Sequence, residues 1–317
     1  MGAFFRRKGS GRWMAAALAL WFLFSAGATL GEGDLRGYDR EEGYVYVTFG
    51  SYPQWMDGGD PENSDDTWAW ASNKIADASG LEIEKSPILW RVLTVDDEKA
   101  YLCSEYVLFA MSIHGNANEY KTMGADFGQT DLCRYLNTVF IQDAFTETEQ
   151  RMLLPCETYG KVFLLDAEDV NSKELGMGRN GNPGMKAQAT EYAIRTDLAY
   201  TTWARAEAEA AGEAEAWEAR YAATHDKAFA FVYKKQYGGH TCYWVRNQST
   251  TDPRHGRCTK EKGTLGHLIC DRLNEGVRPA VYLADGTWTI AGGEGTKEAP
   301  YQIVASAFAT EEEDRVR

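Results

Sequence analysis

Short apolar and aromatic runs, separated by polar turns, dominate both ends of the chain. Residues 44–49 (YVYVTF) combine β-branched and aromatic side chains, which is typical of a strand. The runs ILWRVLTV (88–95) and AYLCSEYVL (100–108) are joined by a short polar segment, so they predict a β-hairpin. Further strands are predicted at 161–165, 228–232, 242–246 and 277–283, and a terminal hairpin at 284–304.

Two helices are predicted in the middle of the chain. Between residues 130 and 141, apolar residues recur at spacings of three and four, which places them on one helix face. Thr130 is a suitable N-cap. A second helix is predicted to begin at Thr146, because Thr146 and Glu149 have the spacing of a capping box.

Residues 198–224 differ in composition from the rest, being rich in Ala, Glu and Arg. A stripe that includes Trp203 and Trp217 predicts an amphipathic helix, about 40 Å long if unbroken at about 1.5 Å per residue. Gly212 weakens its middle. The helix either packs by this stripe with its acidic face in solvent, or binds a partner.

The order of these elements favours one fold class. Helices are predicted mainly in the middle and strands at both ends, without a regular strand–helix alternation. This order favours an α+β fold over a parallel α/β sheet.

The N-terminal residues have the order of a secretory signal peptide. Basic residues at 6–12 precede an apolar run at 14–26, and Ala26-Gly27-Ala28 then supplies small residues for cleavage. We therefore expect a signal peptide at 1–28, a polar linker at 29–43, and a protein that is secreted or held at the cell surface. The alternative is an uncleaved anchor, although the run is short of the roughly 20 apolar residues that a span needs.

Composition and charge exclude some classes of partner. The chain of 317 residues is 44% hydrophobic and 25% charged, which is enough to bury a core. Its formal net charge of −14 is unfavourable for binding nucleic acids or anionic lipids. We expect no nucleic-acid partner, and no membrane association after the signal is removed.

Six cysteines follow the signal segment, an even number that permits up to three disulfides in an exported chain. No CxxC motif is present, so a zinc ribbon or a thioredoxin-like site is disfavoured. The shortest loop would join Cys258 to Cys270, which makes these two the first disulfide candidates. Buried free thiols are the alternative.

Motifs that carry catalysis are mostly missing from the sequence. HExxH, the P-loop and GxSxG are not found after the signal segment. His240, His255 and His267 lie among the C-terminal cysteines, but at irregular spacing. We therefore assign no catalytic residue, no metal ligand and no cofactor.

Eight segments in order resemble DUF6273, a domain family of unknown function in exported and multidomain bacterial proteins. They span about 44–283: YVTFGSYPQ, PILWRVLTV, CSEYVL, TDLCRYLNTVFIQDAF, VFLLDAEDV, TEYA, YWVR and GVRPAVYL. Against this family, residues 198–224 are a helical insertion, 284–304 a C-terminal hairpin extension and 305–317 an acidic tail. The resemblance also suggests a C-type lectin-like fold, similar to that of formylglycine-generating enzymes.

The expected function is that of an exported, non-catalytic binding domain for a protein or glycan ligand outside the cell. Loops on a rigid scaffold carry recognition, so we expect the ligand near the long loops at 171–189 and 247–275. The candidate ligand-binding residues are Trp244, Arg246, Asn247 and Arg278. A formylglycine-generating type of oxidative or metal-dependent enzyme is one alternative, and a glycan-binding module is another.

Overall fold

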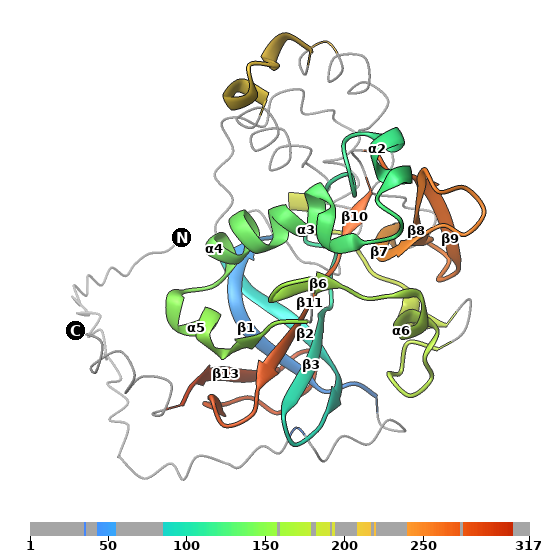
Figure 1. The fold of residues 1–317 in the computed structure, drawn as a ribbon. Helices are drawn as coiled ribbons and strands as arrows, with labels where there is room; N and C mark the ends of the chain where they lie inside the picture. The colour runs from blue at the N-terminus through green and yellow to red at the C-terminus, as the bar shows by residue number, and fades with distance from the viewer. Residues whose placement is uncertain are drawn as a thin grey trace, which may run out of the picture.

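The protein has an α+β fold, as the sequence predicts (Figure 1). The computed structural model describes residue 35 and residues 43–54, 85–156, 159–178, 182–190, 192–193, 208–216, 219, 240–272 and 275–306. The expected signal peptide, the strand predicted at 228–232 and nearly all of the acidic tail lie outside these residues. Within them, no helix is both long enough and apolar enough to cross a bilayer.

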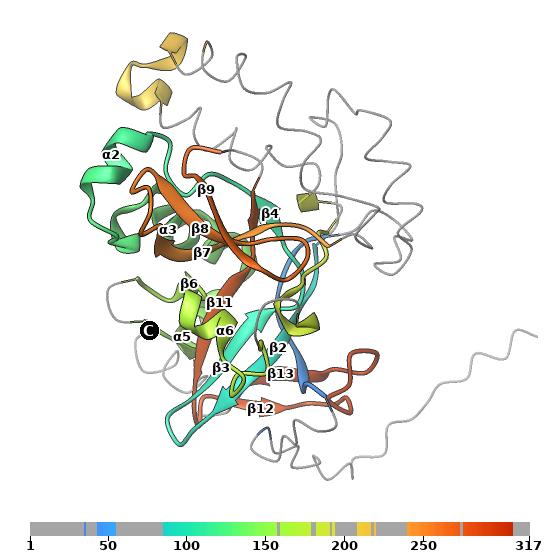
Figure 2. The same ribbon diagram turned by 90° about the vertical axis from the view of Figure 1, so that its right-hand side faces the viewer.

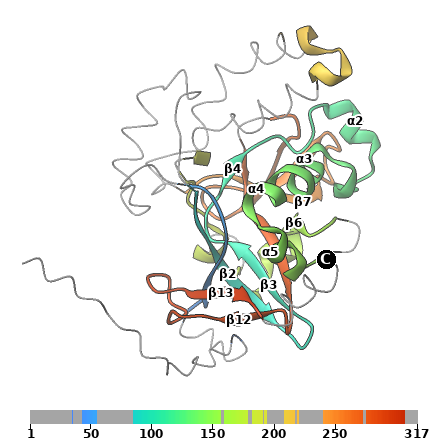
Figure 3. The same cartoon turned by 90° about the vertical axis from the view of Figure 1, so that its left-hand side faces the viewer.

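A large mixed sheet forms the centre of the molecule (Figure 3). Its strands are β1 (Tyr46–Pro53), β2 (Lys85–Val95), β3 (Lys99–Ser104), β5 (Leu153–Leu154), β6 (Val162–Leu164), β11 (Pro279–Ala284), β12 (Trp288–Ile290) and β13 (Tyr301–Ala305). Their order is β12-β13-β1-β2-β3-β11-β5, and β6 also pairs with β11. The β1–β13 pair is parallel, whereas the other pairs of this sheet are antiparallel.

Both predicted hairpins are confirmed. Strands β2 and β3 pair antiparallel with Trp90 opposite Ser104, and β12 pairs antiparallel with β13. The terminal hairpin is joined to the main sheet, because β13 also pairs with β1. The first and last described strands therefore lie side by side.

A second, smaller sheet lies at the end of the large sheet opposite the β12–β13 hairpin (Figure 2). It contains β4 (Phe109–Ala110), β7 (Tyr243–Gln248), β8 (His255–Thr259), β9 (Leu265–Ile269) and β10 (Gly276–Val277), in the order β4-β10-β7-β8-β9. The expectation of a long loop over 247–275 is wrong, since β8 and β9 form a hairpin there. Their sequences, HGRCT and LGHLI, contain glycine and little alternation, so the local pattern gave no strand signal.

Helices pack on both faces of the large sheet (Figures 1 and 3): those within residues 117–152 share a core with Val92 and Leu102, whereas those at 167–171 and 183–185 pack on the opposite face with Leu93 and Tyr101. They are α2 (Ala117–Thr122), η2 (Phe127–Gln129), α3 (Asp131–Tyr135), the π-helical turn η3 (Leu136–Phe140), α4 (Ile141–Ala144), α5 (Glu147–Met152), α6 (Ala167–Asn171) and η4 (Pro183–Met185). The helix predicted from residue 130 is confirmed as the continuous run α3-η3-α4, capped by the Thr130 side chain. The capping box of Thr146 and Glu149 is also confirmed.

Aromatic side chains fill the space between these helices and the sheet. The rings of Tyr52, Phe109 and Phe140 contact one another with centroids 4.9–6.0 Å apart. Trp90, which is fully buried, donates its ring N–H to the carbonyl of Phe49 at 2.7 Å. This packed core fixes the position of the central strands. It therefore also fixes the side chains that project from those strands.

The predicted helix at 198–224 is only partly described, and the described part is not continuous. Residues 208–211 and 214–216 are helical, but the chain turns between them at Gly212, where φ is +76°. A single straight helix is therefore wrong at this point, because the left-handed glycine interrupts the backbone ladder. The remainder of the insertion lies outside the described residues.

Candidate functional site

Trp244 is a core residue and not a surface contact for a ligand. Its side chain is 1% exposed, and its ring N–H donates to the carbonyl of Met111 at 2.7 Å. Strand β7 places the ring between the small sheet and the helices. The predicted ligand contact is therefore wrong: the ring is enclosed by protein, and large aromatic residues stabilise mainly by such burial.

Arg246 and Asn247 hold α6 against β7. The Arg246 guanidinium donates to Asp166 Oδ2 at 2.6 Å and to the carbonyl of Leu164 at 2.7 Å. The side-chain oxygen of Asn247 accepts from the backbone N–H of Ala167 at 2.6 Å, at the start of α6. Both predicted ligand-binding side chains thus use their polar atoms on the protein itself.

Arg278 lies between β10 and β11 and is 1% exposed. Its Nε donates to the carbonyl of Ser104 at 2.6 Å, and its Nη1 contacts the Tyr243 hydroxyl at 3.3 Å. Its Nη2 has no hydrogen-bond partner among the described residues, and the Glu105 carboxylate lies 3.9 Å away. Through Glu105, Arg278 adjoins a pocket that is lined by that carboxylate.

That pocket, which we call the Glu105 pocket, has a volume of about 440 Å³. Its lining residues come from distant parts of the chain: Tyr44, Tyr46, Arg91, Glu105, Pro183, Gly184, Lys186, Ala187, Gln188, His240 and Lys297. Residues 183–188 belong to one of the two loop regions expected to hold the ligand. The size falls within the range of about 300–1,000 Å³ that is usual for small-molecule sites.

The floor of the Glu105 pocket is an ion pair between Arg91 on β2 and Glu105, which directly follows β3. Arg91, on β2, donates from Nε and Nη2 to the same carboxylate oxygen, Glu105 Oε2, at 2.9 and 2.6 Å. Its remaining Nη1 donates to the carbonyl of Gly184 at 2.8 Å. Both side chains are nearly buried, with 5% of Arg91 and 11% of Glu105 exposed. The pair is consequently rigid and little screened by solvent.

Two tyrosines form a wall beside this pair. The guanidinium of Arg91 lies over the ring of Tyr44, 4.0 Å from its centroid, and the ring of Tyr46 meets that of Tyr44 edge to face. Burial, followed by the charge of Glu105, raises the pKa of Tyr46. Among the described residues the Tyr46 hydroxyl has no hydrogen-bond partner, so it is free to contact a ligand.

Glycine permits the close approach of the loop that covers Tyr44. A Cβ added at Gly184 would lie 2.3 Å from the Tyr44 hydroxyl oxygen and 2.5 Å from the carbonyl oxygen of Gly176. Asn182 caps the short η4 turn by accepting from the Gly184 N–H at 2.8 Å. The turn thus places Lys186 and its neighbours at the pocket.

Lys297 is the third cationic group beside Glu105. Its ammonium lies 3.7 Å from Glu105 Oε1 and 5.2 Å from the centroid of the Tyr106 ring. The side chain comes from the turn between β12 and β13, which is fixed to β1 by a hydrogen bond from Tyr46 N–H to the carbonyl of Gly295 at 2.8 Å. Three cations therefore surround one carboxylate.

Sequence reasoning missed Arg91, Glu105 and Lys297. The available signal was weak: two charged residues stand inside otherwise apolar strand runs, ILWRVL and LCSEYVL. A charge at such a position is buried only if it is paired. The sequence predicts that the two runs pair as a hairpin, but it does not show that the Arg91 and Glu105 side chains meet, nor that Lys297 reaches them from a distant turn.

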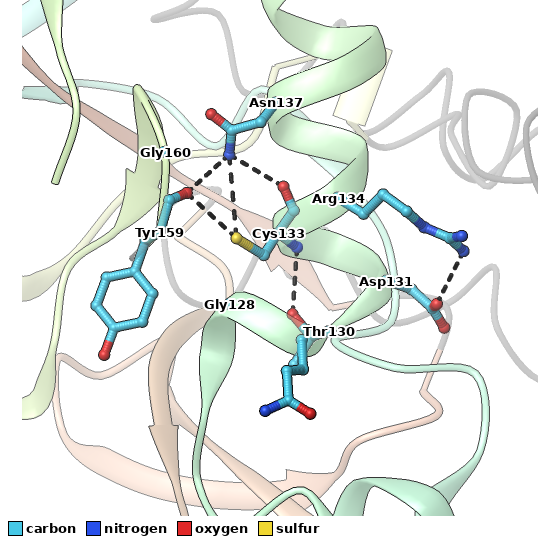
Figure 4. Close-up of a pocket in the computed structure, with 9 residues that line it drawn as sticks. Gly128, Thr130, Asp131, Cys133, Arg134, Asn137, Tyr159 and Gly160 are labelled. Atoms are coloured by element: carbon cyan, nitrogen blue, oxygen red, sulfur yellow. Dashed lines mark hydrogen bonds and ion pairs between the residues drawn. The ribbon is translucent and has the colours of Figure 1, made fainter. Parts of the chain in front are cut away.

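A second pocket of about 490 Å³ lies beside α3 and is shown in Figure 4. Its polar side chains are already used within the protein. The Asn137 amide donates to the carbonyls of Cys133, Tyr159 and Val162 at 2.8–3.0 Å, and Arg134 pairs with Asp131 at 3.2 Å. The Cys133 thiol also points toward the Tyr159 carbonyl, at 3.3 Å. This pocket therefore offers little unsatisfied chemistry to a ligand.

The expected disulfide between Cys258 and Cys270 is wrong, because both residues are free and buried thiols. Strands β8 and β9 pair Cys258 with Gly266, whereas the neighbour of Cys270, Ile269, lies opposite His255. The two cysteines are therefore at different ends of the hairpin. The other four cysteines are free and buried as well.

The thiols lack the environment of a nucleophile. Burial raises the pKa of Cys258 and of Cys270 to about 12, and that of Cys133 to about 11. A reactive cysteine needs the opposite shift, toward the thiolate. Within the described part of the chain, no three His, Cys, Asp or Glu side chains are grouped so as to hold a metal ion.

One histidine is held between two carboxylates. His114 Nδ1 lies 3.0 Å from Asp131 Oδ2, and Nε2 lies 3.3 Å from Glu119 Oε2. Burial alone would lower the pKa of His114, but the bonds to Asp131 and Glu119 outweigh it and raise the pKa. This cluster connects α2 to α3, away from the residues that line the Glu105 pocket.

Comparison with known proteins identifies no relative. No family model matches the chain, and neither a curated protein nor a solved structure shows significant similarity to it. Function must therefore be argued from the site.

Proposed function

We propose that the protein is an exported, non-catalytic domain that binds a small anionic ligand in the Glu105 pocket. The observation that carries this proposal is the excess of positive charge at the floor of the pocket. Two buried guanidinium groups, those of Arg91 and Arg278, share the single carboxylate of Glu105. The Arg278 Nη2 atom has no hydrogen-bond acceptor among the described residues.

A buried cation without a full counter-charge is costly, and a ligand that supplies negative charge offsets that cost. Lys186 and Lys297 add further cationic groups at the pocket. The chain as a whole carries a net charge of −14, so a cationic pocket contrasts with the rest of the molecule. A recessed site of this kind raises the local concentration of anions.

The extracytoplasmic location is part of the proposal and rests on the sequence. The basic, apolar and small-residue order of residues 1–28 supports export. The ligand would then be met outside the cell or at its surface, either free or as part of a glycan or protein.

The finer fold assignment, a C-type lectin-like domain of the DUF6273 kind, is also a proposal. It is supported by the pairing of the first and last described strands, β1 and β13, and by the small second sheet that contains β7 to β9.

An oxidative enzyme of the formylglycine-generating type has less support. Such chemistry requires accessible thiolates held together, whereas Cys258 and Cys270 lie at different ends of one hairpin. Both side chains are fully buried, and their raised pKa values favour the thiol form. The described residues offer no cysteine pair that would favour this alternative.

A titration with simple anions tests the proposal. We expect acetate, sulfate or a larger carboxylate to raise the thermal unfolding temperature at constant ionic strength. Lys186→Ala and Lys297→Ala should each weaken binding about tenfold, because a charge-assisted contact is lost.

Lys121→Ala is the matched control, since it removes the same charge from an exposed site on α2. Equal effects of all three variants would indicate non-specific attraction and would refute a site in the Glu105 pocket. If no anion changes the thermal unfolding temperature, a site in the Glu105 pocket is refuted as well.

A further inference from the structure

We propose that the anionic ligand is a sugar acid, a ring that carries both a carboxylate and several hydroxyl groups. This inference rests on the proposed function and specifies the class of ligand. It follows from the presence of cations and of an acceptor oxygen in the same pocket.

The two carboxylate oxygens of Glu105 differ in their hydrogen-bond partners. Oε2 accepts both hydrogen bonds from Arg91, whereas Oε1 faces the Lys297 ammonium at 3.7 Å. That distance is too long for a hydrogen bond. Oε1 can therefore accept a further hydrogen bond, and a ligand that carries a donor can supply it.

This acceptor discriminates among anions. Sulfate and the deprotonated oxygens of phosphate or acetate have no donor, so they face repulsion from Glu105 Oε1. A hydroxylated acid can donate an O–H to Glu105 while its carboxylate meets Lys186 or Lys297. Such simultaneous use of donor and acceptor gives more specificity than charge alone, because a mismatched ligand leaves a buried polar group unpaired.

The tyrosine wall fits the same class of ligand. The Tyr46 hydroxyl lies free at the pocket and can donate to, or accept from, a second hydroxyl group. The adjacent aromatic edges of Tyr44 and Tyr46 offer apolar surface to the C–H side of a ring. The volume of about 440 Å³ is adequate for a small cyclic ligand.

Charge also separates a sugar acid from a neutral sugar. A neutral hexose could use Glu105 and Tyr46, but it would leave the surplus charge of Arg91 and Arg278 without a counter-ion. The pocket should therefore bind a hexuronate more tightly than the corresponding hexose.

The experiment compares four probes by calorimetric or NMR titration at constant ionic strength: galacturonate, galactose, acetate and sulfate. We expect galacturonate to bind at least about tenfold more tightly than each of the others. Tyr46→Phe should weaken galacturonate about threefold to tenfold through loss of one hydrogen bond, and leave acetate unchanged.

Tyr301→Phe is the matched control, because Tyr301 is also a half-buried tyrosine but does not line the pocket. It should bind galacturonate as the unchanged protein does. A loss equal to that of Tyr46→Phe would overturn the role assigned to Tyr46.

The remaining outcomes separate the two proposals. If acetate and sulfate bind as tightly as galacturonate, and Lys297→Ala weakens all three, the anion site stands and the sugar acid is refuted. If galactose binds as tightly as galacturonate, or if no probe binds, both the sugar acid and the anion site are refuted.

Discussion

Glu105 holds two buried guanidinium groups in place, and its replacement should be far more costly than that of an ordinary surface acid. In Glu105→Gln the shape is retained, but Arg91 and Arg278 lose their shared counter-charge. We expect a loss of about 3 kcal/mol in the free energy of unfolding, as is usual when one partner of a buried ion pair is removed.

Urea denaturation measures this loss, with Glu174→Gln as the control because Glu174 is exposed. The control should change stability by less than about 0.5 kcal/mol. Similar small effects of both substitutions would show that Glu105 does not carry the charge balance beneath the pocket.

His114 makes stability depend on pH in a definite direction. Its pKa in the folded protein is raised above the ordinary value of 6.5, so its protonated form is stabilised by folding. This contribution is complete below about pH 6.5 and is lost as the pH rises through the folded pKa. Asp131 acts in the opposite sense: its pKa is lowered, so its contribution is lost only in acid, below about pH 4.

His114→Asn should therefore destabilise the protein more at about pH 5.5 than at about pH 8. Unfolding in urea at the two pH values provides the comparison, and NMR titration of the ring gives the folded pKa directly. Equal losses at both pH values, together with a ring pKa below 6.5, would contradict the arrangement of His114 between Asp131 and Glu119.

At the scale of the elements, local patterns predicted the parts whose stability is local. Thr130 and Glu149 satisfy backbone groups within a few residues, so their capping roles could be read from spacing. Strands β8 and β9 could not be predicted from local sequence, because their short glycine-containing segments become strands only through pairing with each other and with β7. Gly212 shows the reverse case, in which a single residue interrupts a strong helical composition.

The η4 turn gives a prediction at this scale. Gly184→Ala places a methyl group against Tyr44 and the Gly176 carbonyl, so the turn or the ring must move. We expect a loss of stability of about 1–3 kcal/mol and weaker binding in the Glu105 pocket. Gly292→Ala is the control, because an added Cβ there meets only one atom at an ordinary distance of 3.9 Å.

Thermal unfolding measures the loss of stability, and titration with galacturonate measures the loss of binding. Unchanged stability in Gly184→Ala would mean that the turn does not pack tightly against Tyr44. Reduced stability with unchanged ligand affinity would instead separate the turn from the binding site.

At the scale of the whole molecule, the site combines one predicted hairpin with distant segments whose approach the sequence does not predict. Tyr46 and Arg91 lie on the paired strands β1 and β2, and Glu105 directly follows β3, but Lys186 and Lys297 come from loops more than a hundred residues apart. Arg278, which lies in the GVRPAVYL segment, is among the candidate ligand-binding residues that the sequence offers. Its role below the floor of a pocket depends on tertiary structure alone.

Export is the prediction that belongs to the whole chain. If residues 1–28 are a signal peptide, the secreted protein should begin at Thr29 or a near neighbour. Mass spectrometry of the extracellular fraction determines this N-terminus. Recovery of the chain from the membrane fraction with residues 1–28 still attached would indicate an anchor and contradict cleavage.

Whether the Glu105 pocket binds a sugar acid can be tested by mapping the residues that respond to galacturonate in ¹H–¹⁵N NMR spectra. We expect saturable shifts concentrated at residues 44–46, 105, 184–188 and 297, with little change at 128–137 in the second pocket. These shifts should be strongly reduced in Lys297→Ala and retained in Lys121→Ala. Shifts confined to the second pocket, or their absence at saturating galacturonate, would contradict the assignment of the Glu105 pocket as the binding site.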